Sequence, residues 1–172
     1  MSTLYIALGA NLGRPQAQLM AALDLITAHL TLQACSPLYL SPPKYNTQQP
    51  PFTNAVCAVS TSLPPLPCLH LLQRLEDHLG RQRDSNDRNG PRCIDLDLLL
   101  YGQQCLATPE LTLPHPRMLE RRFVLQPLAD IAPQLHHPIA NTTITQLRDA
   151  CPDPDTLTLL APAGWYPATL PG

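Results

Sequence analysis

The chain contains the stretch Gly90-Pro91-Arg92-Cys93-Ile94-Asp95-Leu96-Asp97-Leu98-Leu99-Leu100-Tyr101-Gly102, in which two aspartates stand two residues apart within an apolar run. This pattern predicts a β-strand, because successive side chains of a strand point to opposite faces of a sheet. Asp95 and Asp97 then share one face. The other face is expected to be apolar and to carry Ile94, Leu96, Leu98 and Leu100.

The two aspartates form half of a candidate metal site. In a strand their Cα atoms lie roughly 6.5–7 Å apart. Both carboxylates can therefore lean onto one hard cation or bracket a pair of Mg²⁺ ions. The alternative is a solvated strand face that happens to carry two aspartates. Because Asp is disfavoured in strands, the pattern favours the metal site.

Arginines accompany this strand on both sides. All but Lys44 of the 11 basic residues are arginines, and most of them lie between residues 74 and 122: Arg74, Arg81, Arg83, Arg88, Arg92, Arg117, Arg121 and Arg122. Guanidinium groups bind phosphate oxygens in a bidentate manner, so arginines near two aspartates indicate a polyphosphate with its Mg²⁺. A GC-rich genome would explain the choice of Arg over Lys, but not this clustering.

Composition limits the class of protein. The 172 residues fit a single domain, and a net charge of −2 without a basic run argues against nucleic acid as a partner. No apolar stretch approaches the ~20 residues of a membrane span, and the first residues lack a charged leader. We therefore expect a soluble, cytoplasmic protein. We also expect a monomer, although the composition does not determine the oligomeric state. The six cysteines form no C-x-x-C pair, so we expect small buried apolar residues rather than zinc ligands or disulfides.

Hydrophobic periodicity predicts the order βαββαβ. It indicates a strand over 4–8 that breaks at a glycine turn over 9–13, a helix from Pro15, and a helix over 66–79. The remaining predicted strands of the core are 32–40, 54–60 and the Asp95 strand. The result is an α+β fold with a ferredoxin-like core, in which helices pack on an antiparallel sheet.

The remaining segments are expected around that core, which covers about residues 3–133. The stretch 41–52 is proline-rich at its ends and polar in the middle, as a binding loop would be. Residues 111–116 would add an edge to the sheet, and 121–131 a capping helix. The proline-rich tail 151–172 is weakly patterned, with Trp165 and Tyr166 as candidate anchors.

Phosphate binding here cannot use a Walker A loop, because residues 9–13 are followed by Arg14-Pro15 and not by Gly-Lys-Ser/Thr. From about residue 4 to residue 133, the chain instead resembles the 6-hydroxymethyl-7,8-dihydropterin pyrophosphokinase (HPPK) family. The segments that carry the resemblance are Ala7-Leu8-Gly9-Ala10-Asn11-Leu12-Gly13, Ser41-Pro42-Pro43, Phe52-Thr53-Asn54-Ala55, Glu76 with Gly80-Arg81-Gln82-Arg83, the stretch 90–102, Leu113-Pro114-His115-Pro116, and Arg121-Arg122-Phe123-Val124-Leu125.

The resemblance implies a reaction and a set of site residues. Family members transfer the β,γ-diphosphate of ATP to a reduced pterin, 6-hydroxymethyl-7,8-dihydropterin, with two Mg²⁺ held by aspartates that match Asp95 and Asp97. The implied catalytic residues are Arg83, Arg92, Asp95 and Asp97. The implied ATP-binding residues are Gln73, Glu76, Arg81, Arg83, Arg92, Leu98, Thr112, His115 and Arg121. The implied pterin-binding residues are Ser41, Pro42, Lys44, Phe52, Asn54, Asp95 and Phe123, with the two phenylalanines on either side of the ring.

Several alternatives remain open at this point. Phe52 and Phe123 could be core residues, and His115 a buried structural histidine. The chain departs from the family pattern at Asn89, Glu110 and Pro116. A different metal-dependent phosphoryl-transfer or nucleotidyl-transfer enzyme would keep the two aspartates without an aromatic pair. A non-catalytic ferredoxin-like module would need neither.

Overall fold

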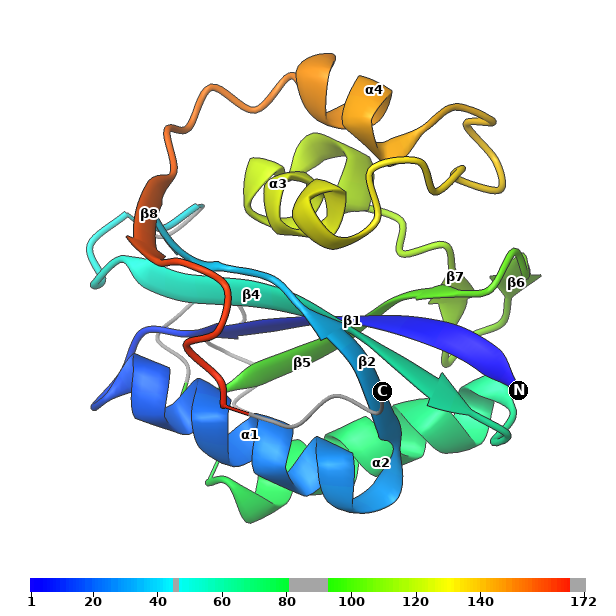
Figure 1. Ribbon diagram of the computed structural model, residues 1–172, viewed down its shortest axis with the longest axis horizontal. Coiled ribbons are helices and arrows are strands. Elements are labelled where there is room, and N and C mark those ends of the chain that lie inside the picture. The colour runs from blue at the N-terminus through cyan, green and yellow to red at the C-terminus, as the bar shows by residue number, and fades with distance from the viewer. Residues whose placement is uncertain (45–46, 81–92, 168–172) are drawn as a thin grey trace.

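The computed structural model describes residues 1–44, 47–80 and 93–167 (Figure 1). Its elements are β1 (Ser2–Ala10), α1 (Pro15–His29), β2 (Thr31–Cys35), β3 (Leu38–Ser41), β4 (Phe52–Thr61), α2 (Pro65–His78), β5 (Asp95–Tyr101), β6 (Leu106–Ala107), β7 (Thr112–Leu113), the 3-10 helix η1 (Met118–Glu120), α3 (Arg122–Ile131), α4 (Ile144–Asp149) and β8 (Thr158–Ala161).

The main sheet is antiparallel and has the strand order β5-β1-β4-β3-β8, with β2 also paired to β4. Helices cover both of its faces: α1 and α2 lie on one, and α3 and α4 on the other (Figure 1). We refer to these as the α1/α2 face and the α3 face. The predicted α+β arrangement, with helices packed on an antiparallel sheet, is confirmed.

Each face has its own hydrophobic core. The alternation of β1 places Leu4, Ile6 and Leu8 on the α1/α2 face, where they pack with apolar residues of both helices. On the α3 face, Val56 of β4 packs with apolar residues of α3 and with Ile144 of α4. The central strands are buried on both sides, which explains why β4 reads as a continuous run of small apolar residues.

The prediction that Leu100 shares a face with Leu96 and Leu98 is wrong. The register between β1 and β5 shifts at Tyr5, so that Leu99 is an extra residue in β5. Leu96 and Leu98 lie in the core of the α1/α2 face, whereas Leu99 and Leu100 both pack in the core of the α3 face. A β-bulge of this kind reverses the alternation for all residues beyond it.

The predicted strand over 32–40 is in fact two strands, β2 and β3, separated by Ser36 and Pro37. Pro37 has no backbone N–H, so the ladder cannot continue through it. Ser36 fills the gap, because its Oγ accepts a hydrogen bond from the backbone N–H of Val56 at 2.9 Å. Its own N–H donates to the Val56 carbonyl, also at 2.9 Å. Both β2 and β3 therefore stay attached to β4.

Residues 111–116 do not extend the main sheet, contrary to expectation. β7 pairs with β6 in a separate two-stranded sheet. The last strand of the main sheet is β8, from the tail, which pairs with β3. The segment after β7 instead lies against β5, because the His115 N–H donates to the Leu99 carbonyl at 2.9 Å.

The helices agree with the prediction, including a proline in the first turn of α1 and α3 over residues 122–131. Trp165 and Tyr166 anchor the tail on the core of the α1/α2 face. The six cysteines are free, but Cys105 is exposed and not buried as expected. Among the described residues, none of the helices has the length and apolarity that crossing a membrane requires.

Candidate functional site

Asp95 and Asp97 stand at the start of β5, half-buried on the α3 face. Register defines what lies beside them: Asp95 is opposite Gly9 of β1, and Gly9 is opposite Asn54 of β4. The start of β5 is also fixed from the opposite face, because the buried Glu76 of α2 accepts a hydrogen bond from the Leu96 N–H at 3.1 Å. Two carboxylates and a buried amide are thus brought to one edge of the α3 face.

Gly9 leaves room in the middle of this row. A Cβ at this position would lie 3.3 Å from Asn54 Oδ1, closer than side chains normally approach. Asn54 itself is fixed, since its Nδ2 donates to Ser41 Oγ at 2.7 Å and to the Phe52 carbonyl at 3.2 Å. The sequence predicts a strand that breaks at Gly9, whereas β1 continues to Ala10. Gly9 therefore serves a close approach within the strand and not a turn.

The loop before β4 is held next to this row. Asn11 is buried, and its Nδ2 donates to Gln49 Oε1 at 3.0 Å and to the Pro50 carbonyl at 2.9 Å. Phe52, the first residue of β4, has the strand parity of Asn54 and therefore lies on the α3 face. The sequence-predicted residues Ser41, Phe52 and Asn54 are thus brought together with Asp95.

The first turn of α3 contributes an aromatic ring and a cation. The Arg121 guanidinium carbon lies 5.7 Å from the centroid of the Phe123 ring, within cation–π distance. Arg121 Nε is buried and has no hydrogen-bond partner among the described residues. A buried donor without a partner costs free energy unless a ligand supplies an acceptor. Phe123 is only half-buried, so part of its surface remains open to a ligand.

His115 is held by its own segment. Its Nδ1 accepts a hydrogen bond from the Arg117 N–H at 3.1 Å. Burial, with smaller effects of the Arg121 and Arg117 charges, lowers the pKa of His115 to about 4. The imidazole is therefore neutral at physiological pH, and the positive charge near it comes from the arginines.

The residues present suit a magnesium ion that is partly held by its substrate. In the described parts of the chain, no three His, Cys, Asp or Glu side chains cluster as a complete cage would need. Mg²⁺ commonly binds through one or two carboxylates and takes its other ligands from substrate phosphates and water. Asp95 and Asp97 supply such a pair of hard oxygen donors.

The comparison with protein families agrees with this geometry. The family described as 7,8-dihydro-6-hydroxymethylpterin-pyrophosphokinase (HPPK) matches residues 5–133. The chain belongs to the HPPK family. Its assignment to the pterin pyrophosphokinase class of transferases, made above from resemblance, is thereby confirmed. The matched range coincides with the extent predicted from the sequence motifs.

Curated relatives in the HPPK family include bacterial and fungal proteins. The 2-amino-4-hydroxy-6-hydroxymethyldihydropteridine pyrophosphokinase of Pseudomonas aeruginosa is 47% identical over 151 residues, which is 87% of this chain and 91% of that protein. The Bacillus subtilis protein of the same name is 42% identical over 76% of this chain and 78% of its own length. The folic acid synthesis protein fol1 of Pneumocystis carinii is 42% identical over 88% of this chain, which spans 20% of that longer protein.

Among solved structures, the fold is similar to that of Plasmodium falciparum HPPK-DHPS crystallised with pteroate. The TM-score is 0.72 at 16% sequence identity, over 87% of this chain and 42% of that one. At this identity the similarity concerns the fold alone.

Some site residues expected from the HPPK family do not join this group. Leu98 is 4% exposed and packs on the α1/α2 face, so its side chain is not available to a nucleotide there. Thr112 is exposed on β7, and the departure at Glu110 forms a contact of 3.1 Å with His70. Gln73 is half-buried on α2, the helix that packs against β5. Pro42 follows β3 directly. Arg81, Arg83 and Arg92 lie outside the described residues.

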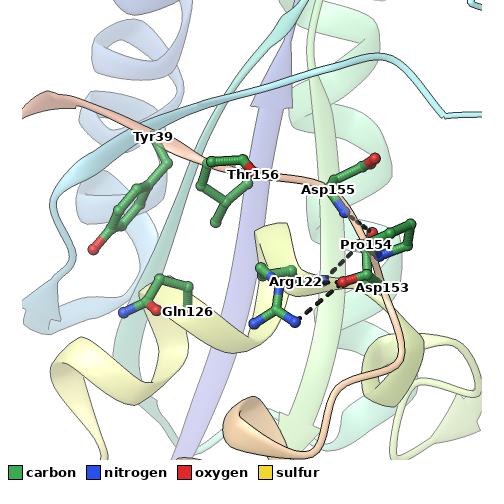
Figure 2. A pocket seen from close by; sticks show the side chains of 8 residues that line it. Tyr39, Arg122, Gln126, Asp153, Pro154, Asp155 and Thr156 are labelled. Atoms are coloured by element: carbon green, nitrogen blue, oxygen red, sulfur yellow. Dashed lines mark hydrogen bonds between the residues drawn. The ribbon is translucent and has the colours of Figure 1, made fainter.

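The ammonium group of Lys44 is turned to the tail. Its Nζ lies 2.8 Å from Asp153 Oδ1 and 3.2 Å from Asp155 Oδ2. The same tail segment borders a cavity of about 500 Å³ between β3 and α3, with Tyr39, Arg122 and Gln126 on its other side (Figure 2). Sequence reasoning missed Asp153 because no periodic pattern surrounds it, and it missed Gly9 because glycine was interpreted as a turn signal.

Proposed function

We propose that this chain transfers the β,γ-diphosphate of ATP to 6-hydroxymethyl-7,8-dihydropterin, giving the pterin diphosphate and AMP, with Mg²⁺ required. The observation that carries the proposal is the row of Asp95, Gly9 and Asn54 across β5, β1 and β4, beside the first turn of α3. It sets two carboxylates next to the buried amide of Asn54, which Gly9 leaves room for. The named relatives carry out a reaction of this class.

The pterin would lie against the α3 face, beside the Asn54 amide. Phe52 and Phe123 are the two half-buried aromatic side chains that approach this region from the sheet and from α3. Stacking on an aromatic face contributes about 0.5–1.5 kcal/mol beyond the burial of area. Asn54 would contribute specificity, because its buried amide would be left without a partner by a heterocycle of the wrong pattern.

The triphosphate would lie between the start of β5 and the first turn of α3. Asp95 and Asp97 would hold Mg²⁺, which when bound neutralises phosphate charge and aligns the reacting groups. Arg121 supports this placement, since its buried Nε lacks a hydrogen-bond acceptor in the described structure. The hydroxymethyl oxygen forms a bond to the β-phosphorus and gives up its proton to water, while the bond between that phosphorus and the α-phosphate oxygen breaks, so that AMP leaves. Positioning and electrostatic stabilisation account for most of the rate in such transfers.

The finer description of the fold is also a proposal. The element order β1-α1-β2/β3-β4-α2-β5 and the strand order β5-β1-β4-β3 support a ferredoxin-like core in which the second strand is split in two. The involvement of Arg83 and Arg92 in turnover, the binding of two Mg²⁺ ions, the monomeric state and the cytoplasmic location remain predictions.

AMP formation from ATP, measured with and without 6-hydroxymethyl-7,8-dihydropterin, tests the proposed reaction. We expect AMP only when both the pterin and Mg²⁺ are present. Asp97→Asn should fold normally but lose at least about a hundredfold in turnover, the size expected for ~3 kcal/mol of lost charge stabilisation. Asp149→Asn, at an exposed carboxylate on α4, is the matched control and should retain activity. Normal turnover of Asp97→Asn at saturating Mg²⁺ would contradict the assignment of the metal site.

A further inference from the structure

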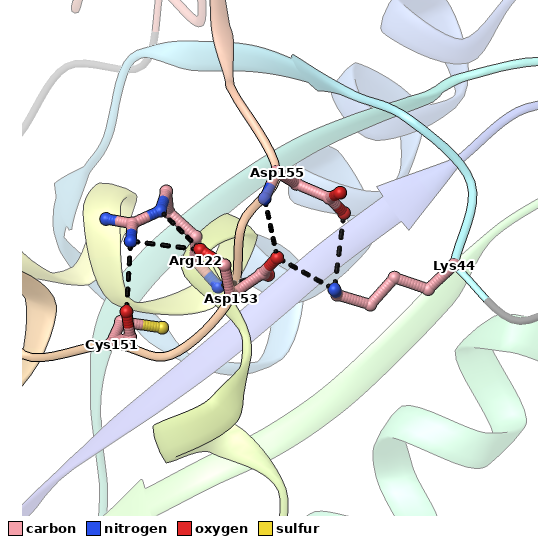
Figure 3. A network of polar contacts seen from close by, with 5 residues as sticks. All are labelled: Lys44, Arg122, Cys151, Asp153 and Asp155. Atoms are coloured by element: carbon pink, nitrogen blue, oxygen red, sulfur yellow. Dashed lines mark hydrogen bonds and ion pairs between the residues drawn. The ribbon is translucent and has the colours of Figure 1, made fainter.

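The carboxylate of Asp153 joins two elements that are far apart in the sequence. Its Oδ1 lies 2.8 Å from Lys44 Nζ, in the loop after β3, and its Oδ2 accepts the backbone N–H of Arg122, at the start of α3, at 2.9 Å (Figure 3). The Asp153 side chain has no exposed surface. We call this pair of contacts the Asp153 bridge. One end of the bridge follows Ser41 and Pro42, and the other precedes Phe123.

Both oxygens of this carboxylate are occupied. Oδ1 also accepts the Asp155 N–H at 2.9 Å, and Asp155 itself contacts Lys44 through its Oδ2. Burial alone would raise the pKa of Asp153, but the hydrogen bonds from Lys44, Arg122 and Asp155 outweigh it and lower the pKa. The group is therefore a carboxylate at neutral pH, and a change to an amide would place a donor against at least one of these donors.

Helix α3 depends on this acceptor. The residue at its N-cap position, Arg121, has no side-chain capping hydrogen bond. The first N–H groups of a helix have no partner within the helix, and Asp153 supplies one from outside. The Arg122 guanidinium in turn donates to the carbonyls of Cys151 and Asp153, each at 3.1 Å, so the segment is fixed to the helix start from both sides (Figure 3).

We propose that Asp153 is a positioning residue for pterin binding, which fixes the loop containing Lys44 relative to Phe123 before the substrate arrives. The inference rests on the proposed function, in which Phe123 lies against the pterin ring, and on the family resemblance, which assigns Ser41 and Pro42, just before Lys44, to the same ligand. Asp153 needs no contact with the substrate. Two elements already held at a fixed separation lose less conformational freedom on binding, so affinity for the ring increases. The nucleotide, which the proposal places at β5 and Arg121, should be much less affected.

The test compares KM for pterin with KM for ATP in Asp153→Asn and Lys44→Met. We expect the KM for pterin to rise at least about tenfold in both variants, while the KM for ATP stays within about twofold. Lys44→Arg, which keeps the cation, should recover most of the pterin affinity. Because both substitutions break the same contact, the KM for pterin of the double variant should be little higher than that of either single variant. Asp149→Asn is the control for a change of carboxylate to amide on the surface.

Several outcomes would overturn the inference. One is an unchanged KM for pterin in a folded Asp153→Asn or Lys44→Met protein. Another is an equal rise in the KM for pterin and the KM for ATP, which would indicate general damage to the fold. If Asp153→Asn fails to fold, Asp155→Asn takes its place, because it removes the second carboxylate that holds Lys44 and leaves Lys44 itself unchanged. Calorimetric titration of pterin in the presence of a non-reactive ATP analogue gives the same comparison without turnover. A wild-type chain that binds pterin but forms no AMP would contradict the proposed reaction only, whereas a wild-type chain that binds no pterin would remove both proposals.

Discussion

The candidate site requires a residue without a side chain at position 9, and Gly9 meets this requirement. Its backbone does not require glycine, since its φ is not positive, so the reason for glycine is the space beside Asn54. A Cβ at Gly9 would crowd Asn54 Oδ1, at 3.3 Å. The amide of Asn54 is held by Ser41 and by the Phe52 carbonyl, so it cannot easily move aside.

Gly9→Ala should therefore impair pterin binding, with a moderate cost in stability. We expect the KM for pterin to rise by about tenfold or more, because the new methyl group crowds the Asn54 amide and displaces it. The free energy of unfolding, from urea titration, should fall by about 1–3 kcal/mol, the usual cost of overpacking. Ala7→Gly, which removes a methyl group from the same strand face, is the control. An unchanged KM for pterin in Gly9→Ala would show that the ring lies elsewhere.

His115 makes stability depend on pH in a defined window. Its pKa is about 4 in the folded protein because of burial and the nearby Arg121 and Arg117, and about 6.5 when the chain is unfolded. Between these values the unfolded state binds more protons, so the free energy of unfolding falls as the pH drops from about 6.5 to 4. The largest loss of unfolding free energy that His115 can cause is about 3 kcal/mol, at 1.36 kcal/mol per pKa unit.

His115→Gln should weaken that dependence. We expect the variant to lose less stability than the wild type between pH 6.5 and 4, as measured by urea denaturation at each pH. His137, whose pKa burial also lowers, is common to both proteins and cancels in the comparison. Parallel curves for the two proteins would mean that His115 takes up its proton in the folded state at an ordinary pH.

At the scale of elements, the break between β2 and β3 is stabilised by one side chain. Ser36 is fully buried, and its Oγ accepts from the Val56 N–H in the middle of β4. Ser36→Ala leaves that buried N–H without its partner and should cost about 1–3 kcal/mol of unfolding free energy. Thermal and urea unfolding would measure the loss. Ser60→Ala, at a half-buried position of β4, should cost less, and equal losses would contradict the role of the Ser36 hydroxyl.

The sequence predicts those elements whose pattern is local and periodic. The alternation around Asp95 and the helical spacing of Leu69, Leu72 and Leu75 suffice for β5 and α2, and both agree with the structure. The bulge at Leu99 was missed because it depends on pairing with β1 and not on composition. β8 was missed because its residues are largely exposed and do not alternate, so only its pairing with β3 makes it a strand.

The residues of the candidate site likewise divide into those that a local pattern predicts and those that only strand pairing brings together. Asp95 and Asp97 can be found from their spacing, since one strand positions both. The row of Asp95, Gly9 and Asn54 needs the register of three strands, which no local pattern contains. The Asp153 bridge joins residues more distant still, and only the folded chain brings Lys44 beside the tail.

At the scale of the whole molecule, the C-terminal segment connects the two faces of the sheet. On the α3 face Asp153 contacts Lys44 and Arg122, and after β8 the chain reaches the other face. There the Trp165 indole N–H donates to the Ser36 carbonyl at 2.8 Å, and the Tyr166 hydroxyl donates to Asp24 at 2.6 Å. The tail predicted only to contain anchors is thus part of the structure of both layers.

Substitution of Trp165 should show how much the anchoring of the C-terminal segment contributes to the free energy of unfolding. Trp165→Phe keeps most of the packing but loses the hydrogen bond to Ser36, and should cost about 1 kcal/mol of unfolding free energy. Trp165→Ala also loses the packed ring and should cost about 2–4 kcal/mol. Urea denaturation with an unchanged m value would measure both. Leu159→Ala, at a side chain that is 57% exposed, is the control, and a loss no larger for Trp165→Ala than for Leu159→Ala would show that the tail is not anchored there.

The pairing of β8 with β3 also bears on how copies of the chain behave toward one another. A strand at the border of a sheet presents a row of backbone donors and acceptors that another polypeptide can extend, and this is a common origin of aggregation. β3 is short, and β8 covers its outer side from Leu38 to Leu40. A chain shortened before Thr158 would expose that row next to the apolar residues beneath it. With β8 in place the border of the sheet lies at β8, whose side chains are largely exposed, and no longer at β3.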